Sequence, residues 1–420
     1  MPETITNDDA QYAYDIVKTI CTEVGPGLPG SPQERERAAI IKRELESHLG
    51  AGNVAVEEFT LAPGALLGHL PFSALVTFLA ALLNLSMGRF TGIWPWVAAV
   101  AALVFAITPL VLYTFEAFLG FELVDPLFKK KQSVNVIGAL RAPGTKDVKR
   151  LLILSGHHDS AWEFTWLRFL RKGYIVAYVT MFLGFITMSV MSIIQLTGVI
   201  TGNADLVRAG TLGWVLLTYP IVPCIVFTLF FTRGWKNGGN VPGAVDNLSA
   251  SALAVAMCRF LVKNPSYIPA DTEIRFISFG SEEAGVRGSR RYVERHLDEL
   301  KRLDARQLNF ETVADPEMAI ITADMNGTVK YPPEMVKGAV AAAERAGVPY
   351  KVKSGYPGAG SDAGPFAKAG IKAVTLLPFK VPQQMVAFYH QKWDTPEVLS
   401  MEALLNVLKL SVEWIRTGGD

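Results

Sequence analysis

Residues 156–160 carry side chains that could bind a metal. They follow the apolar stretch 150–155, whose β-branched content and short length predict a buried strand. His157 stands at the carboxyl end of that strand, and Asp159 points to the same side where the chain stays extended. A carboxylate that fixes the tautomer of a histidine is typical of metal sites. A single histidine after a strand is more often structural, so this run indicates a metal site only in combination with further candidate ligands.

A second run carries adjacent glutamates. Glu282 and Glu283 follow the apolar stretch 272–278 and are bracketed by Gly280 and Gly285. Adjacent glutamates are common on surface helices, but they are unusual directly after a buried strand. Because neighbouring side chains point apart, one carboxylate can bind a metal while the other holds a water.

Three more residues complete an ordered set. Asp246 precedes an apolar helix and could serve equally as its N-cap, Asp324 ends the predicted strand 318–323, and His390 lies near the C-terminus. Carboxylate oxygens with imidazole suit zinc, or else manganese or cobalt. Two ions that share one carboxylate can bridge a water and lower its pKa towards neutrality.

The remaining polar segments alternate between strand and helix patterns. Strands are predicted at 54–61, 133–140, 150–155, 272–278, 318–323 and 373–377. Helices are predicted at 9–24, 32–49, 249–262, 287–301, 333–346, 363–369 and 401–416. This alternation indicates an α/β sandwich with a mainly parallel sheet, in which ligands collect beyond the carboxyl ends of the strands.

Charge is missing from two long blocks. The chain of 420 residues is 19% charged, below the roughly 25% of a typical soluble protein. No Asp, Glu, Lys or Arg occurs in 63–88, 90–115, 173–204 or 209–232. Each run reaches the roughly 20 residues that cross a bilayer, whereas buried core helices usually supply about 10–14. The runs therefore predict two transmembrane hairpins of two helices each.

Basic residues flank these spans on one side. Arg89 and Arg208 stand alone at the hairpin tips, and eight bases flank the spans on the other side: Lys129, Lys130, Lys131, Arg168, Arg171, Lys172, Arg233 and Lys236. The positive-inside rule then predicts an integral, multi-pass membrane protein whose polar domain is cytoplasmic. The polar N-terminus does not resemble a signal peptide, which agrees. Residues 162–172 mix aromatic and basic side chains and predict an interfacial segment.

Composition excludes other classes of site and partner. The net charge of +1 gives no reason to expect a nucleic-acid partner. The 3 cysteines, Cys21, Cys224 and Cys258, are too few and too scattered for a disulfide framework or a thiolate metal site.

The polar part of the chain resembles the aminopeptidase Y-type zinc peptidases, which include bacterial leucyl aminopeptidases and glutamate carboxypeptidase II. The run 279–289 is the most specific likeness. Further fragments of the resemblance are 25–32, 135–137, 156–160, 243–247, 323–325, 361–366 and 389–395.

The resemblance implies a role for each matched residue. Asp246 would bridge two zinc ions, with His157 and Asp324 completing one site and Glu283 and His390 the other. Glu282 would be the general base. Asp159 would orient His157, and Tyr389 would steady the tetrahedral oxyanion. Ser361 and Asp362 would lie behind the ligands or in the substrate pocket.

The expectation is therefore a three-layer α/β sandwich with a mostly parallel mixed central sheet, the zinc exopeptidase fold, and two inserted transmembrane hairpins. The catalytic domain would comprise 1–62, 129–172 and 233–420, and the hairpins 63–128 and 173–232. The predicted function is a membrane-embedded di-zinc aminopeptidase that acts on peptides.

Three alternatives stay open. They are a related zinc carboxypeptidase, a glutaminyl cyclase-like enzyme, and a non-catalytic receptor or assembly subunit. The sequence leaves the oligomeric state open.

Overall fold

The computed structural model describes residues 4–217, 221–232, 241–355 and 360–420. The chain divides into two compact units. The sheet unit comprises Met1–Pro63, Lys129–Glu163 and Gly234–Asp420, and the helical unit comprises Gly64–Phe128 and Phe164–Arg233. Arg233 and Lys236, two of the bases used to predict the membrane orientation, lie outside the described residues.

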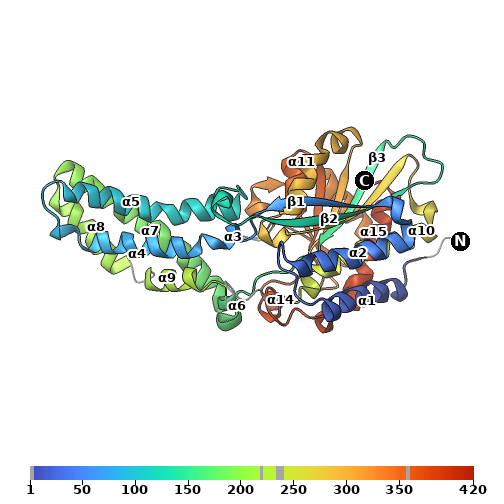
Figure 1. The fold of residues 1–420 in the computed structure, drawn as a ribbon, viewed down its shortest axis with the longest axis horizontal. Coiled ribbons are helices and arrows are strands. Elements are labelled where there is room, and N and C mark those ends of the chain that lie inside the picture. Colours follow the sequence, from blue (N-terminus) through green and yellow to red (C-terminus); the bar gives the residue numbers. More distant parts are fainter. Residues whose placement is uncertain (1–3, 218–220, 233–240, 356–359) are drawn as a thin grey trace. The chain divides into compact units, whose positions relative to one another are not determined.

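The sheet unit contains a mixed sheet of eight strands in the order β1-β2-β4-β3-β5-β10-β6-β9 (Figure 1). Its strands are β1 (Val54–Leu61), β2 (Lys131–Arg141), β3 (Arg150–His157), β4 (Thr272–Phe279), β5 (Arg306–Phe310), β6 (Met318–Ile321), β9 (Tyr350–Lys353) and β10 (Lys372–Leu376). The central strands β4, β3, β5 and β10 run parallel, and β6 runs antiparallel to β10. The predicted mixed α/β fold is confirmed.

Helices cover both faces of this sheet (Figure 1). They are α1 (Asn7–Glu23), α2 (Pro32–Leu49), α10 (Ser249–Lys263), α11 (Arg287–Arg302), α12 (Pro333–Ala346), α13 (Ala363–Lys368), α14 (Gln383–Ala387) and α15 (Met401–Arg416). A Cβ on Gly156 would lie 2.2 Å from Ala250 in α10, so this face of β3 packs tightly on that helix. Phe279, on the opposite face, contacts Tyr292 of α11 and Phe366 of α13.

Two strands of the main sheet, β5 and β9, are absent from the sequence prediction. In β5, Gln307 and Asn309 are fully buried and both hydrogen-bond to Ser155 of β3, which hides the strand from an apolar pattern. The predicted strand 318–323 also divides, because β7 (Ala323–Asp324) leaves the main sheet and pairs with β8 (Val329–Lys330).

The helical unit is formed by α3 (Ala65–Gly68), α4 (Leu70–Leu85), α5 (Trp94–Leu112), α6 (Thr165–Leu170), α7 (Gly173–Thr201), α8 (Ala204–Leu217) and α9 (Ile221–Leu229). Residues 164–172, which the sequence analysis placed in the catalytic domain, belong here. Phe164 pairs with Thr232, and Trp166 Nε1 donates to the carbonyl of Phe227 at 2.8 Å, so the segment is fastened to the end of α9.

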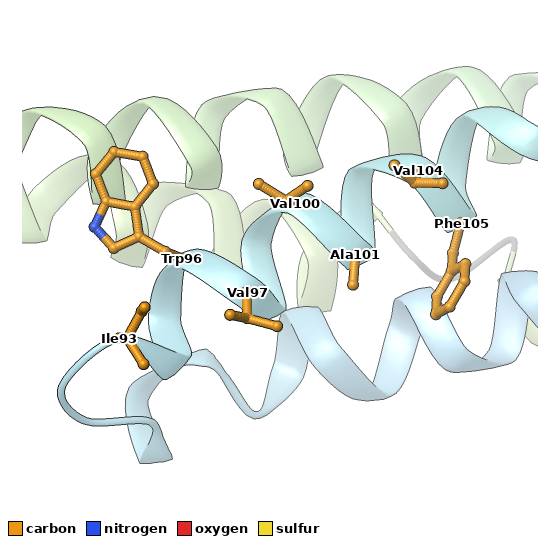
Figure 2. Close-up of a pocket in the computed structure, with 7 residues that line it drawn as sticks. All are labelled: Ile93, Trp96, Val97, Val100, Ala101, Val104 and Phe105. Atoms are coloured by element: carbon orange, nitrogen blue, oxygen red, sulfur yellow. The ribbon is translucent and has the colours of Figure 1, made fainter.

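The helical unit is apolar on the outside, and its mostly apolar interior includes a few hydrogen-bonded polar side chains. Asn84 Nδ2 donates to Ser192 Oγ at 3.1 Å, and Gln195 Nε2 donates to Thr211 Oγ1 at 2.8 Å. Asn84, Ser192 and Gln195 are buried. Many outward side chains are apolar, among them Phe72, Phe78, Val100, Val104, Val176, Leu183, Ile186 and Ile193. A shallow apolar cavity of about 570 Å³ lies along α5 (Figure 2). Such a surface suits a lipid environment better than water.

Four helical segments among the described residues are long and apolar enough to cross a membrane: Ala65–Leu85, Trp94–Phe118, Gly173–Thr201 and Ala244–Lys263. The last contains α10, and 89% of its apolar window is buried inside the protein. We therefore interpret α10 as a core helix. The fourth predicted span, 209–232, falls on α8 and α9, and residues 218–220 between them lie outside the described part.

We predict that Leu253→Ala in α10 lowers the melting temperature of the detergent-solubilised chain by about 5–10 °C. Leu253 is fully buried, and such a truncation costs about 2–5 kcal/mol. Val262→Ala, at an exposed position of the same helix, is the matched control and should shift the melting temperature by only about 1 °C. Equal, small shifts for both variants would contradict the placement of α10 in the core.

Candidate metal centre

The ends of three parallel strands deliver the candidate ligands. His157 ends β3, Glu282 and Glu283 lie in the short helix η7 (Glu282–Ala284) after β4, and Glu311 directly follows β5. The carboxyl ends of parallel strands meet at one edge of the sheet. Two residues from outside the sheet, Asp246 in η5 (Ala244–Leu248) and His390 after α14, reach the same place.

His157 stands at the centre of one group of ligand atoms. Its Nε2 lies 3.5 Å from Asp246 Oδ1, 3.6 Å from Glu282 Oε2 and 3.6 Å from Glu311 Oε1. The ligand atoms of His157, Asp246 and Glu311 all lie within 4.8 Å of one another, which is close enough to hold one ion.

His390 defines a second group beside the first. Its Nε2 lies 3.1 Å from Asp246 Oδ2 and 3.3 Å from Glu283 Oε1. Asp246 therefore turns one carboxylate oxygen to each histidine, as a carboxylate shared by two ions would.

The structure does not bring Asp324 into either group, and this corrects the ligand set expected from the sequence. Asp324 Oδ1 accepts from the amides of Met325 and Ser361 at 2.6 and 3.1 Å, and Oδ2 accepts from Tyr331 Oη and Ser361 Oγ, both at 2.6 Å. Both oxygens are thus engaged by protein donors. Because β6 runs antiparallel to β10, its carboxyl end points away from the edge where β3 and β5 end.

Glu311 occupies the position that was expected for Asp324. The sequence analysis missed it because β5 was missed. The available signal was the short run Leu308-Asn309-Phe310 directly before the glutamate, which resembles the end of a buried strand.

Two other aspartates clamp the backbone that carries these ligands. Asp159 Oδ1 accepts from the amide of Glu282 and Oδ2 from that of Glu283, both at 3.0 Å. Asp159 Oδ1 also lies 3.3 Å from His157 Nδ1. One carboxylate thereby fixes the His157 segment to the loop after β4.

Asp394 repeats this arrangement on the other side. Its Oδ1 accepts from the amide of Val245 at 2.7 Å and its Oδ2 from that of Asp246 at 3.1 Å. Asp394 follows His390 by four residues, so this clamp ties the His390 segment to the segment of the shared carboxylate.

The loop after β4 is packed too closely for side chains at its glycines. A Cβ on Gly280 would lie 2.4 Å from the carbonyl oxygen of Val134. Ser281 adopts a left-handed φ of 55°, and its Oγ donates to buried Glu34 of α2 at 2.6 Å. This packing fixes the position of the backbone that leads into Glu282.

Burial shapes the electrostatics of the carboxylates. It raises the pKa of Glu282 well above its ordinary value and the pKa of Glu311 to about 8. It raises the pKa of Asp362 to about 7. Burial also acts to raise the pKa of Asp246, but the nearby imidazoles of His157 and His390 outweigh it and hold that pKa below its usual range.

The donor set fits metal ions. His157 Nε2, Asp246 Oδ2, Glu283 Oε1 and Glu311 Oε2 are buried without hydrogen-bond partners among the described residues. Buried polar atoms are normally hydrogen-bonded, and unpaired ones point to a bound group. Imidazole with carboxylate oxygens suits zinc.

Tyr389 lies directly against this site. Its ring stacks on His390 with centroids 4.0 Å apart and an interplanar angle of 26°. Burial and the nearby carboxylates, Asp246 first among them, raise the pKa of its hydroxyl well above the ordinary value, so the group is a neutral hydrogen-bond donor.

Part of the chain matches the model of a peptidase family. Residues 232–415 match the model described as Peptidase family M28. This region is therefore similar to that family. It contains Asp246, Glu282, Glu283, Glu311 and His390, while His157 precedes it in the sequence. The predicted resemblance is thereby confirmed at the level of the peptidase family.

A curated relative supports the assignment. The aminopeptidase YwaD of Bacillus subtilis (strain 168) is 33% identical over 169 residues, which make up 39% of this chain and 35% of that protein. The match thus spans about a third of the relative's length.

Solved structures share the fold. BSAP, a zinc aminopeptidase from Bacillus subtilis, superposes with a TM-score of 0.53 at 16% identity, over 96% of this chain and 94% of that one. An aminopeptidase from Aneurinibacillus sp. strain AM-1 gives 0.54 at 16%, over 96% and 92%. A glutaminyl cyclase from an Acidobacteriales bacterium gives 0.54 at 14%, over 100% and 96%. At these identities the likeness concerns the fold.

We predict that Glu311→Gln and Asp324→Asn affect zinc differently. Glu311→Gln should lower zinc affinity at least about tenfold, because it weakens one oxygen donor of the His157 group. Asp324→Asn should keep its zinc but melt at a lower temperature, because an amide cannot accept from all four donors. Zinc titration and thermal melting measure both effects. Equal loss of zinc from the two variants would instead indicate that Asp324 is a zinc ligand.

Proposed function

We propose that this chain is a membrane-anchored zinc aminopeptidase that holds two zinc ions and removes N-terminal residues from peptides. The observation that carries the proposal is the shared carboxylate of Asp246, which faces His157 with one oxygen and His390 with the other.

The protein groups would divide as follows. His157, Asp246 and Glu311 would hold one ion, and Asp246, Glu283 and His390 the other. When bound, zinc supplies a water whose pKa lies near neutrality and polarises the substrate carbonyl. Manganese or cobalt would suit the same donors.

Glu282 is the proposed general base. Its backbone amide is fixed by Asp159, so its side chain is aimed from a rigid point, and its Oε2 lies 3.6 Å from His157 Nε2. Burial raises its pKa, which makes the carboxylate a stronger base. It would take a proton from the attacking water and pass it to the leaving amine. Tyr389, stacked on His390, would donate to the developing oxyanion.

A glutaminyl cyclase-like reaction is the second candidate, since cyclases share the fold. The two histidine groups around one aspartate favour two ions over one, and the identity of the curated relative favours an aminopeptidase. A zinc-to-protein ratio of two, together with release of single amino acids from a defined peptide, would separate the reactions. A carboxypeptidase would release residues from the other end.

The helical unit is proposed to span the membrane in two hairpins. Its outward apolar surface and its long apolar helices support this. In α6, Leu167 is buried while Phe169 and Leu170 are exposed beside Arg171 and Lys172, which supports an interfacial position at the lipid headgroups. The excess of bases on this side supports a cytoplasmic sheet unit.

We predict that Glu282→Gln reduces kcat on aminoacyl reporter substrates about 10²- to 10⁴-fold, because the glutamine cannot accept the proton of the water. Zinc bound per chain should stay at the wild-type level. Glu294→Gln, at an exposed glutamate of α11 that pairs with Arg291, is the control and should keep full activity. Wild-type turnover by Glu282→Gln would refute the proposed mechanism.

The membrane orientation can be tested with single cysteines, after Cys21, Cys224 and Cys258 are replaced by alanine. Thr91→Cys lies at an exposed hairpin tip, and Lys392→Cys lies on the surface of the sheet unit. In intact cells a membrane-impermeant maleimide should label the first. It should label the second only after permeabilisation. Labelling of Lys392→Cys in intact cells would reverse the orientation.

A further inference from the structure

Arg37 in α2 is a fully buried arginine that none of the chemistry above uses. Its guanidinium donates to three carbonyl oxygens: Nε to Gly25 at 2.9 Å, Nη1 to His158 at 3.1 Å and Nη2 to Pro242 at 2.6 Å. The His158 carbonyl lies between His157 and the clamp residue Asp159 in the sequence. The Pro242 carbonyl opens the turn that leads to the shared carboxylate.

The two segments joined by Arg37 are packed against each other without spare room. Gly243 has a φ of 69°, and a Cβ there would lie 2.8 Å from the carbonyl oxygen of Asp246 and 2.9 Å from Ser160 Cβ. A Cβ on Gly27 would lie 2.6 Å from Arg37 Cδ. A small shift of either segment would therefore displace the other.

Several acidic side chains lie near enough to influence the buried charge of Arg37. Asp159, Asp394 and Glu34 all interact electrostatically with the guanidinium. Burial lowers the pKa of Arg37 to about 10, while Cys21 and these carboxylates oppose that shift. The side chain therefore stays cationic at neutral pH. Glu34, on the same helix, also holds Ser281 Oγ just before Glu282.

We infer that Arg37 is a positioning residue, whose guanidinium holds segments 157–159 and 242–246 at their mutual distance by donating to their main-chain carbonyls. The inference rests on the proposed metal centre only in so far as these segments carry its ligands.

The first measurement is zinc affinity, by competition with a chelator on the full chain in detergent. Arg37→Met should bind zinc at least about tenfold more weakly, as is usual when groups behind metal ligands are lost. Arg37→Lys keeps the charge but lacks the planar fork, so it should lie between Arg37→Met and the wild type. The control Arg35→Met removes an exposed arginine of α2 that pairs with Glu58, and it should stay within about twofold. Wild-type affinity in Arg37→Met would overturn the inference.

The second measurement does not depend on metal. In the metal-free chain, hydrogen–deuterium exchange should be faster in Arg37→Met at the clamped amides of Val245, Asp246, Glu282 and Glu283, and unchanged in Arg35→Met. If the wild-type chain binds no zinc, the proposed function fails, and exchange alone decides on Arg37. Unchanged exchange in Arg37→Met would overturn the inference.

Should Arg37→Met fail to fold, Arg37→Lys carries both measurements. Weaker zinc binding and faster exchange at the same four amides would support the inference, and wild-type values of both would overturn it.

Discussion

The sheet unit concentrates carboxylates in a buried space, and this concentration constrains everything around it. Asp246, Glu283 and Glu311 meet within a few ångströms of His157 and His390. Burying unpaired anions is costly, and like charges at such distances raise one another's pKa. The arrangement is stable only if positive charge is supplied at its centre. Divalent ions between the histidines would supply it, and burial keeps water from competing with their ligands.

Clusters of like charge tend to spread, so the backbone needs restraint that does not depend on metal. Asp159 and Asp394 provide this restraint in the same way. The two carboxylate oxygens of each accept hydrogen bonds from two consecutive backbone amides. Hydrogen bonds to a carboxylate are shorter and stronger than those between neutral groups. Each clamp also links a histidine segment to a carboxylate segment, so orientation of the ring and placement of the partner carboxylate are coupled. Arg37 donates to the carbonyls of His158 and Pro242, next to the segments that the two clamps connect.

Much of the fold and of the candidate site could be predicted because one sequence pattern locates both a strand and a ligand. Apolar runs that end at His157 or just before Glu282 locate both a strand and a site residue. That signal fails at β5, where polar side chains are satisfied by Ser155 of the neighbouring strand, and so Glu311 was missed. Asp324 also follows an apolar run, but there the pattern predicts a ligand that the structure does not place in the site. Strand direction depends on pairing across the whole chain, and no local pattern tells that β6 runs antiparallel to β10. Hydropathy has a matching weakness, since the segment that contains α10 is also long and apolar enough to cross a membrane, yet 89% of its apolar window is buried inside the protein.

The insertions themselves obey a simple geometric rule. Leu61, the last residue of β1, pairs directly with Lys131, the first of β2, so residues 64–128 replace the turn of a β-hairpin. Phe164 likewise pairs with Thr232 at the ends of the second insertion. A segment whose ends are already held side by side adds little closure entropy to the host, because that entropy grows only by about 0.6 kcal/mol for each doubling of loop length. The sheet unit can therefore keep its register and its ligand geometry while long helices interrupt it twice, provided that each interruption begins and ends at paired residues. The inserted helices pack among themselves, and buried Asn84, Ser192 and Gln195 add hydrogen bonds between α4 and α7.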